Sequence, residues 1–367
     1  MELKIYYSNI TTCNDPSQDV RKLLGEVHAH DICSLVLFSL ESQEGYHRML
    51  KEYKSAVYEY LGREVPVTLV PQPLLDGCNL AAEIYTFSSP EIRYCTQSDV
   101  TFGLLKTEFS SMIFIEGIAS SSFSDSVKTQ SEEVFNKLDK VLTDNGFHTG
   151  DIVRQWNYIG NITAHRDGRQ NYQEFNDARS TYYHTSQWHH GYPAATGIGA
   201  DSQGIIVGCI AYKSSVSTIY PLNNPLQIAA HEYSKQVLID NNTGAIKSTP
   251  KFERAKLIEV EGRPCCFVSG TAAIRGEQSM EMKSARMQTV QTIENIEYLV
   301  SKQNLVNYGC KPYDLKFANL RVYIKNAEDY LAVKETVEDL YPQVPVIYTI
   351  ADVCRDELLV EIEGILV

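Results

Sequence analysis

Two carboxylates near the end of the chain have the type and spacing for acid–base chemistry. They belong to the run Asp356-Glu-Leu-Leu-Val-Glu-Ile-Glu-Gly-Ile-Leu366, where strand alternation places Glu361 and Glu363 on one face and Val360 and Ile362 on the other. A carboxyl group among apolar neighbours resists ionisation, because desolvation disfavours its charged form, and it can then donate a proton near neutral pH. The pattern taken alone favours a simpler interpretation, in which both glutamates face water on an edge strand.

Several arginines stand in apolar or aromatic settings instead of runs of charge: Arg154, Arg179, Arg254 and Arg321. An arginine in a half-buried position needs an anionic partner, which is either an acidic side chain or a carboxylate of a ligand. For each arginine alone an acidic side chain is the favoured partner, since Asp and Glu together number 46 against 33 for Lys and Arg. Together the four arginines are compatible with a pocket for a small dicarboxylate.

Metal, phosphate-loop and covalent chemistry find little support. His231-Glu232 lacks the second histidine of an HExxH motif, and the other histidines have no partners at a recognisable spacing, so no metal site is expected. The glycines of Pro193-Ala-Ala-Thr-Gly-Ile-Gly-Ala200 match neither GxGxxG nor GxxxxGK[ST] and indicate a tight turn. No GxSxG motif occurs, and a cysteine nucleophile would need a histidine that only the fold brings near.

Composition limits the partners. The net charge of -13 argues against a nucleic acid or an anionic membrane, whereas a small anionic substrate would need locally placed arginines. The nine cysteines are scattered and form no CxxC pair, which is typical of reduced thiols, and no segment is apolar enough to span a bilayer. We therefore expect a cytoplasmic location.

The elements that must position these residues follow a repeated order. In the final third, strands are expected at 254–260, 264–269, 315–325, 344–350 and 358–366, and helices at 278–303 and 327–340. The middle of the chain repeats this ββαβαββ order, with strands at 100–106, 111–118, 152–159, 194–198 and 205–212 and helices at 126–145 and 172–184. An echo between Phe114-Ile-Glu-Gly-Ile-Ala119 and Phe267-Val-Ser-Gly-Thr-Ala272 supports a duplicated α+β domain, with helices on one face of a mixed sheet.

The length of 367 residues suits two or three domains. We divide the chain into an irregular N-terminal α/β part at 1–95, a central domain at 96–240 and a C-terminal domain at 250–367, with a linker rich in turn-forming residues at 240–250. The N-terminal part, with strands near 3–7 and 35–39 and a helix around 46–61, is either a degenerate third unit or an extension.

Seven segments, in order from about residue 100 to the end, resemble the chorismatase family. They are Trp156-Asn-Tyr158, Tyr172-Gln-Glu-Phe-Asn-Asp-Ala-Arg179, Pro193-Ala-Ala-Thr-Gly-Ile-Gly199, Phe252-Glu-Arg-Ala255, Val268-Ser-Gly-Thr-Ala272, Gly276-Glu277 and Cys354-Arg-Asp-Glu-Leu-Leu-Val-Glu-Ile-Glu363. The first hundred residues match much less clearly. The closing Val-Glu-Ile-Glu also resembles the Rid/YjgF-like deaminases, whose fold the chorismatases share and whose element order is the ββαβαββ inferred above.

The resemblance implies an enzyme without a cofactor that removes the enolpyruvyl group of chorismate as pyruvate. It implies that Glu361 is the catalytic acid, which protonates the methylene carbon of the enol ether. It further implies that arginines and tyrosines hold the two substrate carboxylates, and our candidates for substrate binding are Arg154, Tyr158, Arg179, Arg254, Thr271 and Arg321. The arginine of the penultimate strand that Rid deaminases use for a carboxylate has no counterpart in Val344–Ile350, which counts against imine hydrolysis.

Product choice divides the family. One branch adds water and releases a dihydroxycyclohexadiene carboxylate, and another rearranges the substrate to 3-hydroxybenzoate, with a relative that also makes 4-hydroxybenzoate. A cysteine seven residues before the acid marks the hydroxybenzoate branch, and Cys354 has this spacing from Glu361. A small residue of the Ser-Gly-Thr-Ala segment also affects the product and is either Gly270 or Ala272. We expect 3-hydroxybenzoate, while Cys354 as a small buried apolar residue and a Rid-like deaminase or metabolite-binding module remain alternatives. Because repeated units can build internally what Rid proteins build as trimers, we expect a monomer.

Overall fold

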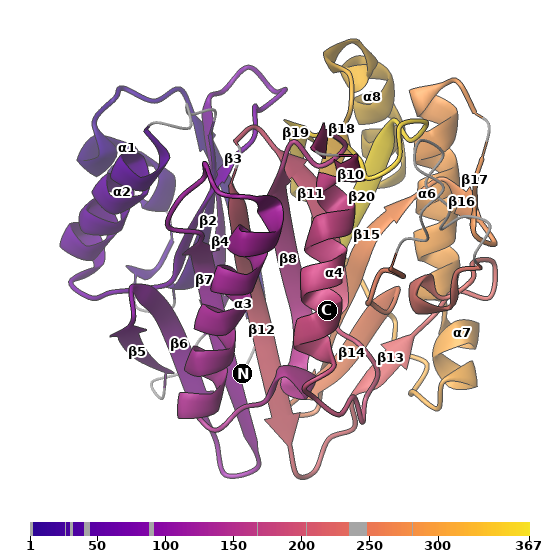
Figure 1. Cartoon of the computed structure of the whole chain (residues 1–367), viewed down its shortest axis with the longest axis horizontal. Helices are drawn as coiled ribbons and strands as arrows, with labels where there is room; N and C mark the ends of the chain where they lie inside the picture. Colours follow the sequence, from indigo (N-terminus) through magenta and orange to yellow (C-terminus); the bar gives the residue numbers. More distant parts are fainter. Residues whose placement is uncertain are drawn as a thin grey trace.

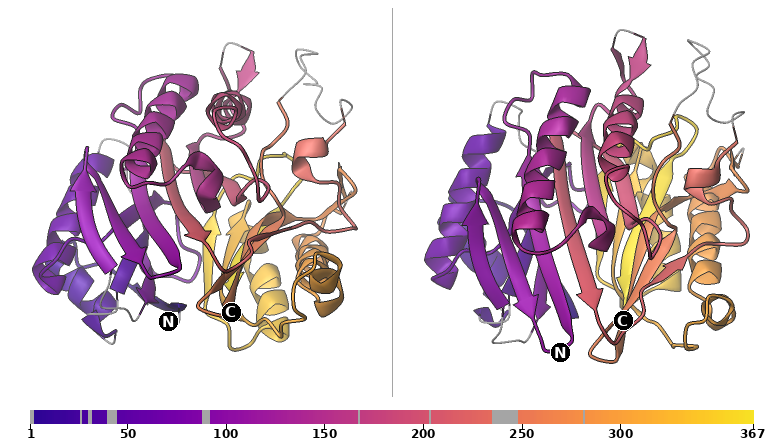
Figure 2. Two further views of the ribbon diagram at one scale, coloured as in Figure 1. Left: turned by 90° about the horizontal axis from the view of Figure 1, so that it is seen from below. Right: turned by 60° about the horizontal axis from the view of Figure 1, so that its bottom comes forward.

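The computed structural model describes residues 3–25, 27–29, 32–39, 45–87, 92–166, 168–202, 204–234, 248–280 and 282–367. Three sheets are arranged around a shared interior, and most of the long helices lie on their outer faces (Figures 1 and 2). The predicted α+β class and the ββαβαββ order are confirmed. Residues 240–247 of the linker predicted at 240–250 lie outside the described residues.

The central unit is a six-stranded sheet of order β11-β8-β12-β7-β6-β5 with two helices. Its elements are β5 (Ile92–Gln97), β6 (Val100–Lys106), β7 (Ser110–Ala119), α3 (Val127–Asp144), β8 (Ile152–Gly160), α4 (Asn171–Tyr183), β11 (Ala194–Ala200) and β12 (Ile205–Ser214). A small hairpin of β9 (His165–Arg166) and β10 (Arg169–Gln170) precedes α4. The parallel pair β11–β8 is the expected result of a strand–helix–strand crossover through α4.

The C-terminal unit repeats this plan in a sheet of order β13-β14-β15-β20-β18-β19. Its elements are β13 (Tyr220–Leu222), β14 (Ala255–Val260), β15 (Arg263–Ala272), α6 (Ala285–Leu299), α7 (Lys302–Asn307), β18 (Phe317–Ile324), α8 (Tyr330–Leu340), β19 (Val346–Ile350) and β20 (Val360–Leu366). The helix predicted at 278–303 is shorter at both ends. Gln278–Ser279 instead forms β17, which pairs with β16 (Ile274–Arg275), and Ser301 caps the separate helix α7.

The N-terminal unit is regular. It consists of β1 (Leu3–Ile10), α1 (Pro16–Leu24), β2 (Ile32–Ser39), α2 (Tyr46–Leu61), β3 (Val67–Pro71) and β4 (Leu80–Phe87), in a sheet of order β1-β4-β2-β3. This order corresponds to β7-β12-β8-β11 of the central unit, so the part expected to be irregular has the βαβαββ order of a third unit without its first strand. No helix in the described ranges is long and apolar enough to cross a membrane.

Each unit contacts the other two. Between the N-terminal and central units, the Thr68 hydroxyl of β3 donates to Glu116 Oε2 of β7 at 2.5 Å. Between the central and C-terminal units, the N–H of Ala195 in β11 donates to Ser269 Oγ of β15 at 2.9 Å. The ring closes where Ile350 N–H donates to the carbonyl of Pro73 at 2.9 Å. The inner faces of all three sheets contribute to one apolar core, and smaller cores lie under α3 and α4 and under α6 and α8.

The terminal strand β20 lies in the middle of its sheet, between β15 and β18. Val360 and Ile362 point into the core under α6 and α8, while Glu361 and Glu363 face the interior between the units. The edge-strand interpretation of these glutamates is therefore wrong, because both neighbouring strands are hydrogen-bonded to β20 and other units cover its inner face.

Candidate active site

A cavity opens where the central unit meets the C-terminal unit, and Glu361 is part of its wall. The central unit contributes residues of α4 and β11, and the C-terminal unit contributes β15, the segment before β14 and the segment before β20. The lining residues are Gln170, Tyr172, Gln173, Asn176, Arg179, Ala195, Gly197, Tyr233, Ser248, Pro250, Phe252, Arg254, Gly270, Ala272, Ile274, Cys354, Arg355, Leu358 and Glu361. Six of the ten predicted site residues are thus brought together here.

The floor of the cavity depends on a local irregularity of β15. The pairing of β15 with β20 shifts register between Val268 and Thr271, which frees the intervening Ser269 and Gly270 to bond to β11. Ser269 Oγ accepts from Ala195 N–H at 2.9 Å and donates to the carbonyl of Glu253 at 2.6 Å. Gly270 N–H donates to Thr196 Oγ1 at 3.0 Å. A bulge of this kind is a common way to re-aim backbone groups beside a site.

The Glu361 carboxyl group occupies the space that a side chain at position 270 would take. A Cβ atom at this position would overlap Glu361 Oε1 and lie 3.1 Å from Thr196 Cγ2. The backbone conformation does not require glycine here, since the φ angle of Gly270 is not in the left-handed region. Glycine is favoured at this position because it has no side chain, which leaves room for the carboxyl group of Glu361.

Glu361 is 6% exposed and has no hydrogen-bond partner among the described residues. The pKa of this carboxyl group is raised to about 8, mainly by burial and in addition by the neighbouring Glu363, while Arg154 and Arg254 act in the opposite direction. A carboxyl group with such a pKa carries a proton at neutral pH. It is a Brønsted acid aimed into a cavity.

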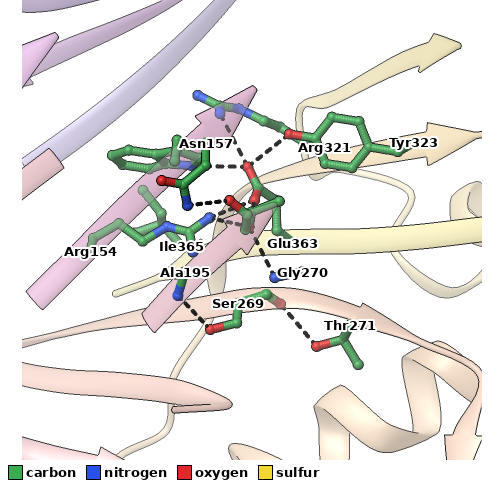
Figure 3. A network of polar contacts seen from close by, with 12 residues as sticks. Arg154, Asn157, Ala195, Ser269, Gly270, Thr271, Arg321, Tyr323, Glu363 and Ile365 are labelled. Carbon is green, nitrogen blue, oxygen red and sulfur yellow. Dashed lines mark hydrogen bonds and ion pairs between the residues drawn. The ribbon is translucent and has the colours of Figure 1, made fainter. Parts of the chain in front are cut away.

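Glu363 has the opposite environment (Figure 3). Its carboxylate accepts from Arg154 Nη2 at 2.5 Å, Trp156 Nε1 at 3.0 Å, Arg321 Nη1 at 3.1 Å and the Tyr323 hydroxyl at 3.1 Å, and also from Thr196 Oγ1. Burial alone would raise its pKa, but Arg154 and Arg321 outweigh burial and hold the pKa of Glu363 below its usual value. Two glutamates two residues apart are therefore set to opposite protonation states.

The N-terminal unit completes this network through Glu83 of β4. Glu83 Oε2 accepts from Arg321 Nε at 2.9 Å, Arg321 Nη2 at 2.5 Å and the Tyr85 hydroxyl at 3.1 Å. Asn319 Nδ2 donates to the other oxygen at 3.0 Å. Side chains from all three units thus meet around Arg321, which is 1% exposed.

Four predicted substrate-binding residues are not in the cavity wall. Arg154 and Arg321 are committed to Glu363 and Glu83, and the Tyr158 hydroxyl accepts from Arg321 Nη1 at 2.8 Å. The Thr271 hydroxyl donates to the carbonyl of Ser269 at 2.9 Å. These four residues therefore do not line the cavity, although Nε and Nη1 of Arg154 are buried without a hydrogen-bond partner among the described residues. Their part in substrate binding stays a prediction.

The remaining predicted arginines do face the cavity. Arg179 Nη2 donates to Asn176 Oδ1 at 2.6 Å, and Arg254 Nη2 donates to the carbonyl of Ile228 at 2.9 Å and to the Tyr233 hydroxyl at 2.7 Å. In the described part of the chain, neither arginine has an acidic partner, and the Nε atoms of both are buried without a hydrogen bond. Unpaired guanidinium groups in a cavity wall are suited to a carboxylate ligand.

Sequence reasoning missed Arg355, Tyr233 and Tyr172, which also line the cavity. Arg355 Nη1 donates to the carbonyl of Glu277 and to Ser279 Oγ, at 3.0 Å each. Arg355 directly follows Cys354, and Tyr172 is the first residue of one of the segments that resemble the chorismatase family, so the sequence could have indicated both as site residues. Nothing in the sequence indicated Tyr233, because only the fold brings it to Arg254.

Cys354 is half-buried beside Glu361 and lines the same cavity. Burial, reinforced by the charge of Glu361, raises the pKa of its thiol to about 12. The thiol is therefore neutral and a poor nucleophile. The described residues hold no group of His, Cys, Asp and Glu side chains arranged to bind a metal ion.

A chorismatase crystal structure matches this structure over 100% of both chains with a TM-score of 0.72 at 20% identity, which establishes the fold. The family model described as "Chorismatase FkbO/Hyg5-like, N-terminal" matches residues 81–211.

Two curated relatives match in sequence. A 3-hydroxybenzoate synthase of Streptomyces hygroscopicus is 31% identical over 230 residues, which cover 60% of this chain and 64% of the relative. A chorismatase of Streptomyces rapamycinicus is 31% identical over 227 residues, which cover 58% of this chain and 63% of the relative. The matched region thus spans less than two thirds of either relative. These matches confirm the resemblance to the chorismatase family.

Proposed function

We propose that this protein is a chorismatase that converts chorismate to pyruvate and a hydroxybenzoate, with Glu361 as the proton donor. The observation that carries the proposal is the buried Glu361 carboxyl group, without a hydrogen-bond partner among the described residues, in a cavity wall that also presents Arg179 and Arg254 without acidic partners. Burial raises the pKa of this carboxyl group to about 8. A dianionic substrate needs such cations, and an enol ether needs an acid. The names of the two relatives support the substrate.

The proposed reaction begins with the Glu361 proton moving to the methylene carbon of the enolpyruvyl group. This carbon becomes the methyl group of pyruvate, and the adjacent ether carbon becomes an oxocarbenium-like centre, which weakens the bond between the ether oxygen and the ring. The developing positive charge lies between Glu361, which is now a carboxylate, and the substrate's own carboxylate. The arginines orient the substrate, because their guanidinium groups match a carboxylate bidentately.

We propose 3-hydroxybenzoate as the aromatic product. In this route the oxygen of a ring hydroxyl bonds to the ring carbon that loses the ether oxygen and then gives up its bond to its original carbon. The ring aromatises as one ring carbon releases its hydrogen as a proton, which replaces the proton that Glu361 gave. Chorismate is then divided into two products without consuming water. The position of Cys354 beside Glu361, and the name of the 3-hydroxybenzoate synthase relative, support this product over the diene made by hydrolysis.

Of the two small residues considered for product choice, Gly270 has the more direct geometry. Its Cα lies against the Glu361 carboxyl group, whereas Ala272 pairs with Glu361 across the β15–β20 ladder. We therefore assign the main effect on the product to Gly270.

Chromatography and mass spectrometry of a reaction run in H₂¹⁸O test the function and the product together. Pyruvate and an equal amount of 3-hydroxybenzoate without ¹⁸O in its hydroxyl group are expected. A dihydroxycyclohexadiene carboxylate in place of 3-hydroxybenzoate would show hydrolysis, in which water adds to the oxocarbenium carbon and the ring keeps the ether oxygen. The absence of pyruvate above the uncatalysed background would contradict the function. Ammonia release from 2-aminoacrylate without chorismate cleavage would favour the deaminase alternative.

We also propose that the chain is a monomer divided at 1–95, 96–240 and 250–367, in the cytoplasm. The support is that three units of one plan already contact each other within the chain, and that all nine cysteines are free. Light scattering of the purified protein tests the oligomeric state: a mass of two or three chains would contradict it.

A further inference from the structure

The charges of the buried network balance without Glu361. Its ion-paired carboxylates are Glu83 and Glu363, and its cations are Arg154 and Arg321, with ion pairs of 2.5, 2.5 and 3.1 Å between them. Glu116, also buried near both arginines, forms no ion pair among the described residues, and burial raises its pKa to about 7. The four ion-paired side chains are at most 3% exposed. A third carboxylate beside this set would carry an uncompensated charge in a region where water does not screen it.

Glu361 is adjacent to this balanced set. It shares a face of β20 with Glu363, since residues two apart in a strand point the same way. A short path also joins the two carboxyl groups. The Thr196 hydroxyl donates to Glu363 and accepts from Gly270 N–H, and Gly270 lies against the Glu361 carboxyl group.

We propose that Glu363, fixed as a carboxylate by the arginines, is a positioning residue that keeps the neighbouring Glu361 carboxyl group protonated in the cavity. The inference rests on the proposed function, in which Glu361 is the acid, and it gives Glu363 a role in the reaction without contact with the substrate.

Charged and titratable groups approach Glu361 from each element packed around it. They are Glu363 on β20, Arg154 on β8, Tyr172 and Arg179 on α4, Arg254 before β14, and Cys354 and Arg355 before β20. The facing segment of β15, residues 269–272, contributes no titratable side chain. Burial raises the pKa values of Tyr172 and Cys354, so both are neutral. Among these groups the carboxylate of Glu363 favours the protonated form of Glu361, and Arg154 and Arg254 oppose it.

A direct test is the titration of Glu361 by carbon-13 NMR in the full-length protein without substrate, with the signal assigned by its loss in Glu361→Gln. In the wild type the carboxyl group is expected to titrate near pH 8. Glu363→Gln is expected to lower this value by about one pH unit, because it removes the like charge and leaves Arg154 free to favour the ionised form. The alkaline limb of kcat/KM for chorismate should move down by the same amount.

Glu83→Gln is the matched control. It also removes one carboxylate of the buried network and leaves an arginine unpaired, so it should lower Tm about as much as Glu363→Gln does. Its carboxylate lies on the other side of Arg321 and does not act on Glu361, so the titration of Glu361 should stay in place. Arg154→Gln, which removes a cation, should move the titration upward.

The inference is overturned by an unchanged titration of Glu361 in Glu363→Gln, by an equal shift in Glu83→Gln, or by a wild-type value in the ordinary range for glutamate. If Glu363→Gln does not fold, Arg154→Gln decides: an upward shift supports the inference, and no shift or a downward one contradicts it. Because the NMR measurement needs no turnover, a protein with these shifts that does not cleave chorismate would contradict the proposed function alone.

Discussion

The Cα atom of Gly270 and the carboxyl group of Glu361 occupy adjoining space so closely that no side chain fits between them. One residue comes from the bulged end of β15 and the other from the start of β20. Glu361 can therefore extend into the cavity because Gly270, on the neighbouring strand, has no side chain. No described residue donates a hydrogen bond that would stabilise the ionised form of Glu361.

Gly270→Ala should reduce chorismate cleavage by about a hundredfold, because the added methyl group must displace Glu361 or push β11 and β15 apart. The product ratio should change as well. Steady-state kinetics with product analysis by chromatography checks both. Ala272→Gly, which removes a methyl group from the same wall, is the control for a general effect of altered volume. Wild-type turnover and products in Gly270→Ala would contradict the close contact.

The activity should depend on a protonated Glu361. Because the pKa of this group is raised to about 8, kcat/KM should be level near neutral pH and fall tenfold per unit above about pH 8. Glu361→Gln should lower kcat by about 10²- to 10⁴-fold and abolish this limb. A pH series for both proteins measures the effect, and turnover by Glu361→Gln at the wild-type rate would exclude the residue as the acid.

Stability should depend on the same proton. In the folded protein the pKa of Glu361 is above its unfolded value of 4.5, so the folded state binds the proton more tightly. The contribution is present in full below pH 4.5 and is lost as the pH rises through about 8. Relative to Glu361→Gln, the wild type should lose about 3–5 kcal/mol of unfolding free energy over this range, at about 1.4 kcal/mol per unit. Urea denaturation of both proteins at pH 5 and pH 9 tests this expectation, and a constant difference would contradict it.

The two unpaired arginines of the cavity should serve substrate binding. Arg179→Met and Arg254→Met should each raise KM for chorismate by about 10- to 100-fold, the loss expected for hydrogen bonds to a charged group. Arg321→Met offers the contrast. It leaves Glu83 without a cationic partner and Glu363 with Arg154 alone, and it should cost about 3–5 kcal/mol of stability. Similar Tm losses for all three variants would show that the cavity arginines are structural.

Cys354 should affect the product more than the rate. Its thiol is neutral and next to Glu361, so Cys354→Ala leaves a small space beside the acid that a water molecule can enter. We expect the diene fraction to rise at the expense of 3-hydroxybenzoate, with kcat reduced by less than about tenfold. Chromatography of the reaction products measures the ratio. If Cys354→Ala leaves the ratio of diene to 3-hydroxybenzoate unchanged, Cys354 serves packing alone.

Periodicity was sufficient to predict the two complete units, because their strands and helices alternate apolar and polar residues over long segments. It failed for β20. Alternation shows that Glu361 and Glu363 share a face, but it does not show what covers that face, and the cover comes from β8, β11 and β4 of other units. The same limit explains Arg154 and Arg321, which were correctly expected to meet anions. Their partners are acidic side chains more than 40 residues away or in another unit, and no local pattern reveals such a pairing.

The N-terminal unit was the hardest part to predict because its first strand is absent and its spacing does not repeat that of the others. The sequence did not indicate that Glu83 forms a buried ion pair, since a single glutamate in an apolar strand is usually a solvated residue. Only the closed arrangement of three sheets brings it to Arg321.

The repeated units also differ at corresponding positions. In the C-terminal unit Ala272 faces Glu361 across the ladder, and in the central unit Ala119 faces Ile206, which is fully buried. An assembly of identical subunits must carry the same side chain at every interface, so a buried acid introduced for catalysis would destabilise all of its interfaces. In a single chain with three such interfaces, the side chains at each interface can differ. Two of its interfaces can be selected for cohesion alone while the third tolerates the unsatisfied arginines and the carboxyl group that the reaction requires.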